Sequence, residues 1–260
     1  MKKIIGLLLV IILVVIGVYF VYKNTGNDEV LTEEEKQELE DILNATSTVS
    51  DSEDLAVELP EAEPYMGQDI EEIGNDPILE KFPKETVEKY VSELFLLREK
   101  LIEDNLNVNA WMRVAQLKKV FNNYIGARDA WEYVAYLAPN NATVQFNLAG
   151  LYGFYLKDYQ KAEEKFELAI ILEPRNTNYY INAADFYKNF YTEKKERAEE
   201  MLLKGVEEMP NDSSLLAYTA DYYKSVGNIE KAISYFEKAL ELDPGNEGIR
   251  GEIEKLKAGL

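Results

Sequence analysis

Residues 213–244 read SSLLAYTADYYKSVGNIEKAISYFEKALELDP, and this stretch decides the fold. Its second half places the small residue Ala232 four positions before the aromatic Phe236, and it ends in Pro244. Proline ends a helix because it has no N–H to donate and its ring clashes with the preceding turn. In the first half, small and apolar residues between Leu216 and Tyr223 recur at three- and four-residue steps, which predicts one buried helical stripe. The stretch therefore predicts two paired helices.

The same pattern recurs through the second half of the chain at an almost constant spacing. Four prolines stand 35, 36 and 34 residues apart, at Pro139, Pro174, Pro210 and Pro244. An alanine lies twelve positions before each proline, at Ala127, Ala162, Ala198 and Ala232. A large apolar residue follows each alanine after four positions, at Trp131, Phe166, Leu202 and Phe236. A fixed period of this length indicates an array of helical hairpins, and such arrays present surfaces that hold other molecules.

This pattern resembles the tetratricopeptide repeat, which reads W-x2-L-G-x2-Y, then A-x3-F, then P. The resemblance covers residues 107–245 and implies four repeats in an all-α solenoid of helical hairpins. The sequence departs from the family pattern at Lys118, where a Tyr is usual, at Gln145, where a Trp is usual, and at Gly205, where an Ala is usual. None of these residues conflicts with a helix. The two longer intervals are expected to place their extra residues in the turns between paired helices, where insertion costs little.

Flanking helices are expected to close the array at both ends. Residues 83–106 contain a predicted packing helix over 84–104, with its apolar side on the first repeat. Residues 246–260 contain a predicted capping helix over 247–258, with three apolar residues turned inward. Arrays need such caps because a terminal repeat otherwise exposes its apolar face.

The amino-terminal sequence predicts a single transmembrane helix that acts as a signal-anchor. Residues 4–22 contain no charged residue and consist mainly of Ile, Leu and Val. At 1.5 Å per residue a helix of this length spans roughly 28 Å, which is about one hydrocarbon core. Lys2 and Lys3 precede the span and acidic residues follow it, so the positive-inside rule predicts that residues 1–3 are cytoplasmic and the repeats extracytoplasmic. A cleaved secretory signal is the alternative, but the apolar run is longer than usual and no small-x-small cleavage site follows it.

Residues 23–82 are expected to form an acidic, largely disordered and flexible linker. Residues 24–82 hold nineteen Asp and Glu against Lys36 and Lys81, so most of the formal net charge of −20 lies here. Such a composition cannot bury enough apolar surface to fold alone, although one short helix is predicted to start at Thr32. The linker is interpreted either as a spacer that holds the repeats off the membrane or as a solubilising segment without a partner of its own.

The composition argues against catalysis. The chain has no His and no Cys, which removes the usual general base, the thiolate nucleophile and most transition-metal sites. No phosphate-binding glycine loop is present, and scattered basic residues in an acidic chain do not favour nucleic-acid binding. We therefore expect no enzymatic activity, metal, cofactor or small-molecule substrate, and a protein or peptide as the partner.

The resemblance implies where such a partner would bind, because in tetratricopeptide proteins the first helix of each pair lines a concave groove. The candidate peptide-binding residues beside the packing stripe are Arg113, Gln116, Lys119, Phe146, Asn147, Asn182, Lys188, Tyr218 and Lys224. The amides of Asn147 and Asn182 can both donate to and accept from an extended backbone, and the lysines would suit carboxylates of the partner. The alternative is that these side chains are ordinary solvated groups, with Lys188 and Lys224 paired to Asp185 and Asp221 on their own helices.

Three functions fit the sequence. The first is a membrane-anchored adaptor or scaffold that binds an extended peptide segment of a partner in the concave groove, within an envelope assembly or a secretion complex. The second is a structural subunit that self-associates, or packs on another membrane protein, through the convex face. The third, a hydrolase or sugar-binding enzyme built on a solenoid, has the least support. Groove substitutions would disrupt the first function and spare the second.

Overall fold

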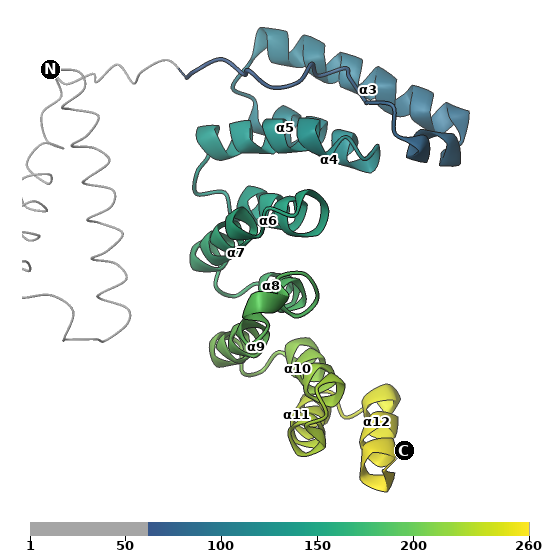
Figure 1. The fold of residues 1–260 in the computed structure, drawn as a ribbon, viewed down its shortest axis with the longest axis vertical. Helices are drawn as coiled ribbons and strands as arrows, with labels where there is room; N and C mark the ends of the chain where they lie inside the picture. Colours follow the sequence, from purple (N-terminus) through teal and green to yellow (C-terminus); the bar gives the residue numbers. More distant parts are fainter. Residues whose placement is uncertain (1–61, 260) are drawn as a thin grey trace, which may run out of the picture. The chain divides into compact units, whose positions relative to one another are not determined.

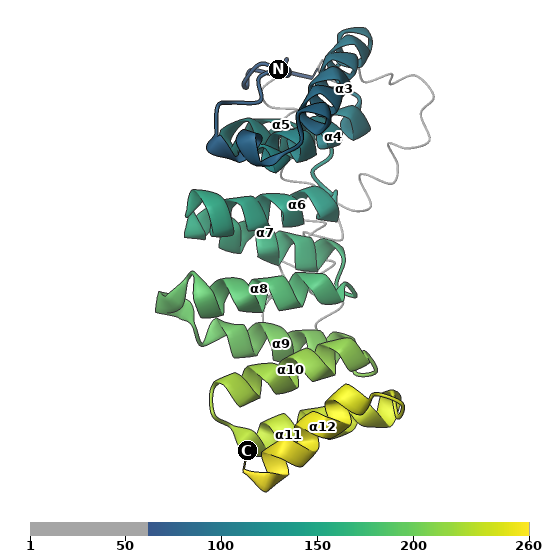
Figure 2. The ribbon, with the colours of Figure 1, turned by 90° about the vertical axis from the view of Figure 1, so that its right-hand side faces the viewer.

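The computed structural model describes residues 62–259, and within this range all regular structure is helical (Figure 1). Four antiparallel helix pairs stack one after another: α4 with α5, α6 with α7, α8 with α9, and α10 with α11 (Figure 2). This confirms the predicted all-helical solenoid of paired helices. The α-helices are α3 (Lys84–Glu103), α4 (Val108–Val120), α5 (Tyr124–Leu137), α6 (Ala142–Gly150), α7 (Tyr159–Leu172), α8 (Thr177–Asn189), α9 (Arg197–Glu208), α10 (Ser213–Ser225), α11 (Ile229–Leu242) and α12 (Glu247–Ala258).

An Asn or Asp side chain sets where most of these helices begin. Each such residue accepts a hydrogen bond from the backbone N–H three positions further on, which satisfies one of the free donors at the start of a helix. The capping residues are Asn107, Asn123, Asn141, Asp158, Asp212, Asn228 and Asn246. The boundaries of the hairpins are therefore fixed largely by local sequence.

The small-then-large pattern of the second helices lies in the core. Ala127, Ala162, Ala198 and Ala232 have no exposed surface, and Trp131, Phe166, Leu202 and Phe236 are buried one turn further on. A methyl side chain at the first position allows close helix packing, and the large side chain at the second position fills the space beside it.

The second and third repeats accommodate their extra residues in different ways. In the second repeat α6 continues into a π-helical turn, η2 (Leu151–Leu156), which takes up one additional residue inside the first helix. Gly153 lies in this turn, where a Cβ would come within 2.8 Å of the Phe186 ring. In the third repeat a short 3-10 helix, η3 (Thr192–Lys194), lengthens the connection between α8 and α9. The expected placement in the turn is therefore correct for the third repeat and wrong for the second.

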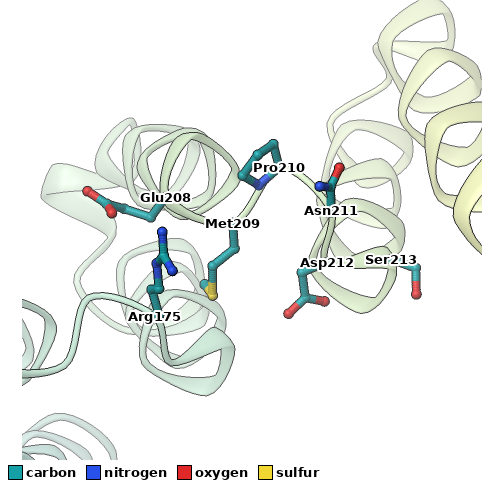
Figure 3. A pocket seen from close by; sticks show the side chains of 7 residues that line it. All are labelled: Arg175, Glu208, Met209, Pro210, Asn211, Asp212 and Ser213. Carbon is teal, nitrogen blue, oxygen red and sulfur yellow. The ribbon is translucent and has the colours of Figure 1, made fainter.

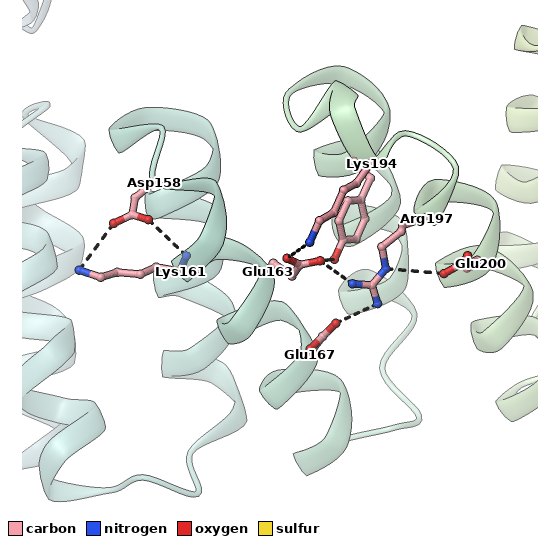
Figure 4. A network of polar contacts seen from close by, with 8 residues as sticks. Asp158, Lys161, Glu163, Glu167, Lys194, Arg197 and Glu200 are labelled. Atoms are coloured by element: carbon pink, nitrogen blue, oxygen red, sulfur yellow. Dashed lines mark hydrogen bonds and ion pairs between the residues drawn. The ribbon is translucent and has the colours of Figure 1, made fainter.

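Each later repeat is tied to the preceding one through a tyrosine near the end of its first helix. The hydroxyls of Tyr152, Tyr187 and Tyr223 donate to Glu132, Glu163 and Glu199 at 2.8, 3.0 and 2.7 Å. A basic side chain lies over each tyrosine ring, namely Lys161, Arg197 and Lys231. The network is densest at Glu163, because Lys194 and Arg197 bond to the same carboxylate (Figure 4). These contacts hold successive hairpins in register.

The first repeat differs, because Lys118 stands where the later repeats have this tyrosine. Lys118 is fully buried, and its ammonium donates to the backbone carbonyls of Asp69 and Glu72 at 2.6 and 2.7 Å. Burial lowers the pKa of Lys118. In the later repeats the tyrosine bonds to a glutamate carboxylate of the repeat before it. In the first repeat, backbone carbonyls of residues 69 and 72 take the place of that carboxylate.

Residues 62–82 pack on the first repeat, which corrects the predicted extent of the linker. The Tyr65 ring lies 4.3 Å from that of Trp111 and 5.5 Å from that of Tyr133. A short 3-10 helix, η1 (Pro77–Lys81), then leads into α3. The prediction of a linker over 23–82 is wrong for residues 62–82, because a segment that cannot fold alone can still order on a surface that accepts its few aromatic and apolar side chains.

Both ends of the repeat array are covered within the described range, since α3 packs on α4 and α12 packs on α11. The predicted transmembrane helix over 4–22 and the linker up to residue 61 lie outside the described residues. Among residues 62–259, no helix has the length and apolar character that crossing a membrane requires.

Candidate functional site

The candidate site is the row of side chains that the sequence predicts on the first helices of the hairpins, called here the first-helix face. All of its members lie on α4, α6, α8 or α10, and none is fully buried. They are Arg113, Gln116, Lys119, Phe146, Asn147, Asn182, Lys188, Tyr218 and Lys224. Some of their polar groups already have hydrogen-bond or ion-pair partners within this chain and others do not. Only the polar groups without such partners can bind a ligand without first breaking a contact.

Arg113 is engaged by the helix that precedes the repeats. Its guanidinium makes two hydrogen bonds to the carboxylate of Glu93 on α3, with distances of 2.6 Å from Nε and 2.9 Å from a terminal nitrogen. The hydrogen bond from Arg113 lowers the pKa of Glu93, and the same bond raises the pKa of Arg113. The two-point contact ties α3 to α4, so the charge of Arg113 is largely compensated.

The carboxyl-terminal half of the face is also internally paired. Lys224 on α10 lies 2.8 Å from Asp221 and 2.8 Å from Glu252 on α12, and these bonds raise its pKa. Tyr218 donates instead to Asp185 on α8. Lys188 donates to the Ser225 hydroxyl at 2.7 Å. The alternative pairing predicted from the sequence is therefore present for Lys224 with Asp221, whereas Asp185 binds a tyrosine of the next repeat.

The two asparagines of the face are not equivalent. The Asn182 amide nitrogen donates to the carbonyl of Asn178 in its own helix at 2.9 Å. The side chains of Asn147 on α6 and Gln116 on α4 form no hydrogen bond with any residue between 62 and 259. An unengaged amide can both donate and accept, so the amino-terminal half of the face has polar groups free to meet a ligand.

Lys119 is a partly buried cation held by aromatic rings. Its ammonium lies 5.3 Å from the ring centroid of Tyr155 and 5.8 Å from that of Trp131. Burial lowers its pKa, and no carboxylate within the described residues forms an ion pair with it. Cation–π attraction offsets part of the cost of desolvating the charge. Lys119 therefore provides a positive charge that an anionic group could still neutralise.

Phe146 has a packing role. Its ring stacks on Tyr179 with centroids 4.8 Å apart, and it lies edge-on to Phe166. Phe146 thus packs α6 against α8, and only part of its side chain remains exposed for contact with a ligand. Sequence reasoning missed Glu93, Glu252 and Tyr155 as neighbours of the face, because each comes from a different helix and no spacing along the chain reveals it.

Three open pockets lie away from the first-helix face. One is lined by Arg175 and by residues 208–213 in the connection between the third and fourth repeats (Figure 3). A second lies between residues 68–77 and the turn at 121–125, and a third lies between Tyr65 and α5. None of the three is lined by the nine predicted residues. In the described part of the chain no three acidic side chains are grouped as a metal site.

Comparison with known proteins agrees with the helical repeats. The family model of the tetratricopeptide repeat matches residues 213–246. The fold is similar to a crystal structure of MamA at 19% sequence identity and a TM-score of 0.50, covering 66% of this chain and 97% of MamA. The search of curated proteins gives no match.

Two further structures are less similar. YrrB, a tetratricopeptide repeat protein with an unusual peptide-binding site, is 19% identical with a TM-score of 0.46, covering 62% of this chain and 82% of its own. TTC0263, a tetratricopeptide repeat protein of Thermus thermophilus, is 18% identical with a TM-score of 0.47, covering 66% of this chain and 93% of its own. The match at 213–246 and the likeness to MamA support a tetratricopeptide repeat fold, and at such identities the likeness concerns the fold alone.

Proposed function

We propose that this chain is a non-enzymatic interaction scaffold that binds an extended segment of a partner protein on the first-helix face. The observation that carries the proposal is that Gln116, Lys119 and Asn147 have polar groups without hydrogen-bond or ion-pair partners among residues 62–259. These three lie on α4 and α6. The partner segment is therefore centred on the first two repeats.

The chemistry of these three side chains suits an extended acidic segment. An extended backbone presents N–H and C=O groups alternately, and the amides of Asn147 and Gln116 can bond to either. Lys119 can neutralise a carboxylate of the partner, since its ammonium lies near two aromatic rings and forms no ion pair or hydrogen bond in the described part of the chain. Arg113 and Lys224 contribute less, because each is already compensated by a carboxylate of this chain.

The proposal includes an anchor and a location, both supported by the sequence. Residues 4–22 would span the membrane, and the lysines before them would keep the amino terminus in the cytoplasm and the repeats outside it. The scaffold would then serve an envelope assembly or a secretion complex. Protease added to intact cells should digest the repeats; repeats that stay protected until the membrane is opened would contradict the location.

Site-specific photo-crosslinking in the native membrane tests the binding face. A photoreactive amino acid at Gln116 should give an adduct with one partner protein, and Asn147→Ala in the same chain should reduce the yield. The matched control is the same amino acid at Lys238, an exposed position on the second helix α11. Equal adducts from both positions, or a yield unchanged by Asn147→Ala, would contradict binding on the first-helix face.

A further inference from the structure

Residues 62–72, called here the strap, lie on the first hairpin (α4 and α5) and form neither helix nor strand. Side chains of the hairpin bind the strap through its backbone, and main-chain bonds of this kind are how proteins hold extended peptides. The Glu63 N–H donates to the Tyr136 hydroxyl at 3.0 Å, the Tyr133 hydroxyl to the Glu63 carbonyl at 3.0 Å, the Gln68 N–H to Asp129 at 3.2 Å, Lys118 to the Asp69 and Glu72 carbonyls at 2.6 and 2.7 Å, and the Asn123 amide to the Glu72 carbonyl at 3.0 Å.

One side chain of the strap selects which segment fits this surface. The Tyr65 ring lies 4.3 Å from the Trp111 ring and 5.5 Å edge-on to the Tyr133 ring. Aromatic contacts of this geometry add to the stabilisation that comes from burying the ring. A segment that takes the place of the strap therefore needs an aromatic residue at the position of Tyr65 and carbonyl groups placed to meet Lys118.

The strap is held less firmly than the repeats beneath it. None of residues 62–82 is buried as a whole. The side-chain oxygen of Gln68 is nevertheless shielded from solvent, and it has no hydrogen-bond partner among residues 62–259. Open pockets remain beside the strap, against the turn at 121–125 and against α5. A segment with few buried side chains and an unsatisfied polar group opens at a lower free energy than a packed core.

The strap can also leave without stranding a charge. When it detaches, the ammonium of Lys118 regains contact with water, so the cost of keeping that charge buried disappears. Residues 73–75 provide a hinge, because Gly74 is exposed and has a φ of 79°, where glycine is unstrained. Asp76 caps η1 through the Ile78 N–H. The strap can therefore turn about the hinge while η1 and α3 keep their places.

We propose that two copies of this chain exchange straps, so that the strap of each copy binds the first hairpin of the other. A second copy supplies Tyr65 and the same backbone groups, so exchange replaces every contact of the strap by an identical one and changes only the hinge. The anchor proposed above would hold the copies at a high local concentration. Once both straps are exchanged, each hairpin is occupied and the product is a closed dimer. The contact uses none of the nine residues of the first-helix face and so goes beyond the proposed function.

Crosslinking between two variants of the full chain tests the exchange. The chain has no cysteine, so each introduced thiol is unique. One variant carries Gln68→Cys in the strap, and a second, of different tag, carries Asp129→Cys on α5; the two positions adjoin, because the Gln68 N–H donates to Asp129. The variants are coexpressed, purified in nonionic detergent and treated with a short bismaleimide. Exchange predicts a covalent heterodimer. Lys238→Cys, at an exposed position on α11, replaces Asp129→Cys in the matched control and should give only background.

Substitutions within the strap separate exchange from chance collision. Tyr65→Ala in the Gln68→Cys copy should lower the heterodimer yield by about fivefold or more, because the altered strap competes with the intact strap of the other copy. Met66→Ala in the same copy should leave the yield unchanged, since the Met66 side chain is exposed.

Sedimentation of the unaltered chain, which needs no substitution, should show monomer and dimer together. The proposal is overturned if that chain is monomeric up to about 0.1 mM, if the heterodimer yield does not exceed that of the Lys238→Cys control, or if Tyr65→Ala leaves the yield unchanged. A different protein crosslinked to Asp129→Cys in place of the second copy would also overturn it.

Discussion

Replacing Lys118 by Met tests whether residues 62–82 belong to the folded unit. The substitution keeps the length and apolar stem of the side chain and removes two charge-assisted hydrogen bonds, to the carbonyls of Asp69 and Glu72. Hydrogen bonds to a charged group contribute about 1.5–3 kcal/mol each. Two features reduce the net loss. Each carbonyl keeps a second donor, from the Glu72 N–H and the Asn123 amide respectively, and the desolvation cost of the buried ammonium disappears.

We therefore expect Lys118→Met to lower the free energy of unfolding of residues 62–260 by about 1–3 kcal/mol. The adjacent Lys119→Met is the matched control, because the ammonium of Lys119 donates no hydrogen bond to any of the described residues, and it should lose less than about 1 kcal/mol. Urea unfolding followed by circular dichroism measures both changes. Proteolysis within residues 62–82 should also become faster in Lys118→Met. A variant as stable and as resistant as the unaltered protein would refute the role assigned to these bonds.

Further predictions concern the core, the insertion and alkaline pH. A fragment of residues 83–260 should unfold at lower urea than one of residues 62–260, because it loses Tyr65 against Trp111 and the partners of Lys118; equal midpoints would contradict this. Ala232→Trp should prevent cooperative folding, since Ala232 has no exposed surface, and a sharp thermal transition near that of the unaltered protein would count against the packing described. Gly153→Ala should cost about 1–3 kcal/mol by overpacking against Phe186, measured by urea unfolding beside Gly251→Ala, where a Cβ meets nothing. Burial above all raises the pKa of Tyr180 and Tyr223 to about 12. Because unfolded tyrosine ionises near pH 10, the stability they contribute is complete below about pH 10 and is lost as pH rises to about 12; a free energy of unfolding that stays constant from about pH 10 to about pH 12 would contradict this.

The sequence predicts the repeats because their determinants are local. The spacing of Pro139, Pro174, Pro210 and Pro244 fixes the period, and the alanine with its large apolar partner fixes the packing of paired helices. Helix starts follow from capping Asn and Asp side chains, which act within three residues of the helix. These features depend on neighbours along the chain, so a single sequence is enough to recognise them.

The remainder depends on contacts between distant residues. Lys118 is visible in the sequence as a departure from the repeat pattern, but its carbonyl partners some fifty positions earlier are not. The acidic composition of residues 24–82 also hides the aromatic contact made by Tyr65. Likewise, the pairing of Arg113 with Glu93 and of Tyr218 with Asp185 follows from how helices stack. The sequence therefore predicts which residues lie on the first-helix face. Only the structure shows which of their side chains already have a hydrogen-bond or ion-pair partner in this chain.

The most direct test of the proposed function is the affinity of the partner segment recovered by crosslinking at Gln116, measured by titration calorimetry. Asn147→Ala should weaken binding by about 1–3 kcal/mol, because peptide groups of the partner lose their amide partner, and Lys119→Glu should weaken it further, with a dependence on salt. Asn182→Ala should have a smaller effect than Asn147→Ala, since the Asn182 amide nitrogen already bonds its own helix. Equal affinity for the unaltered protein, Asn147→Ala and Lys119→Glu would contradict the binding face proposed here.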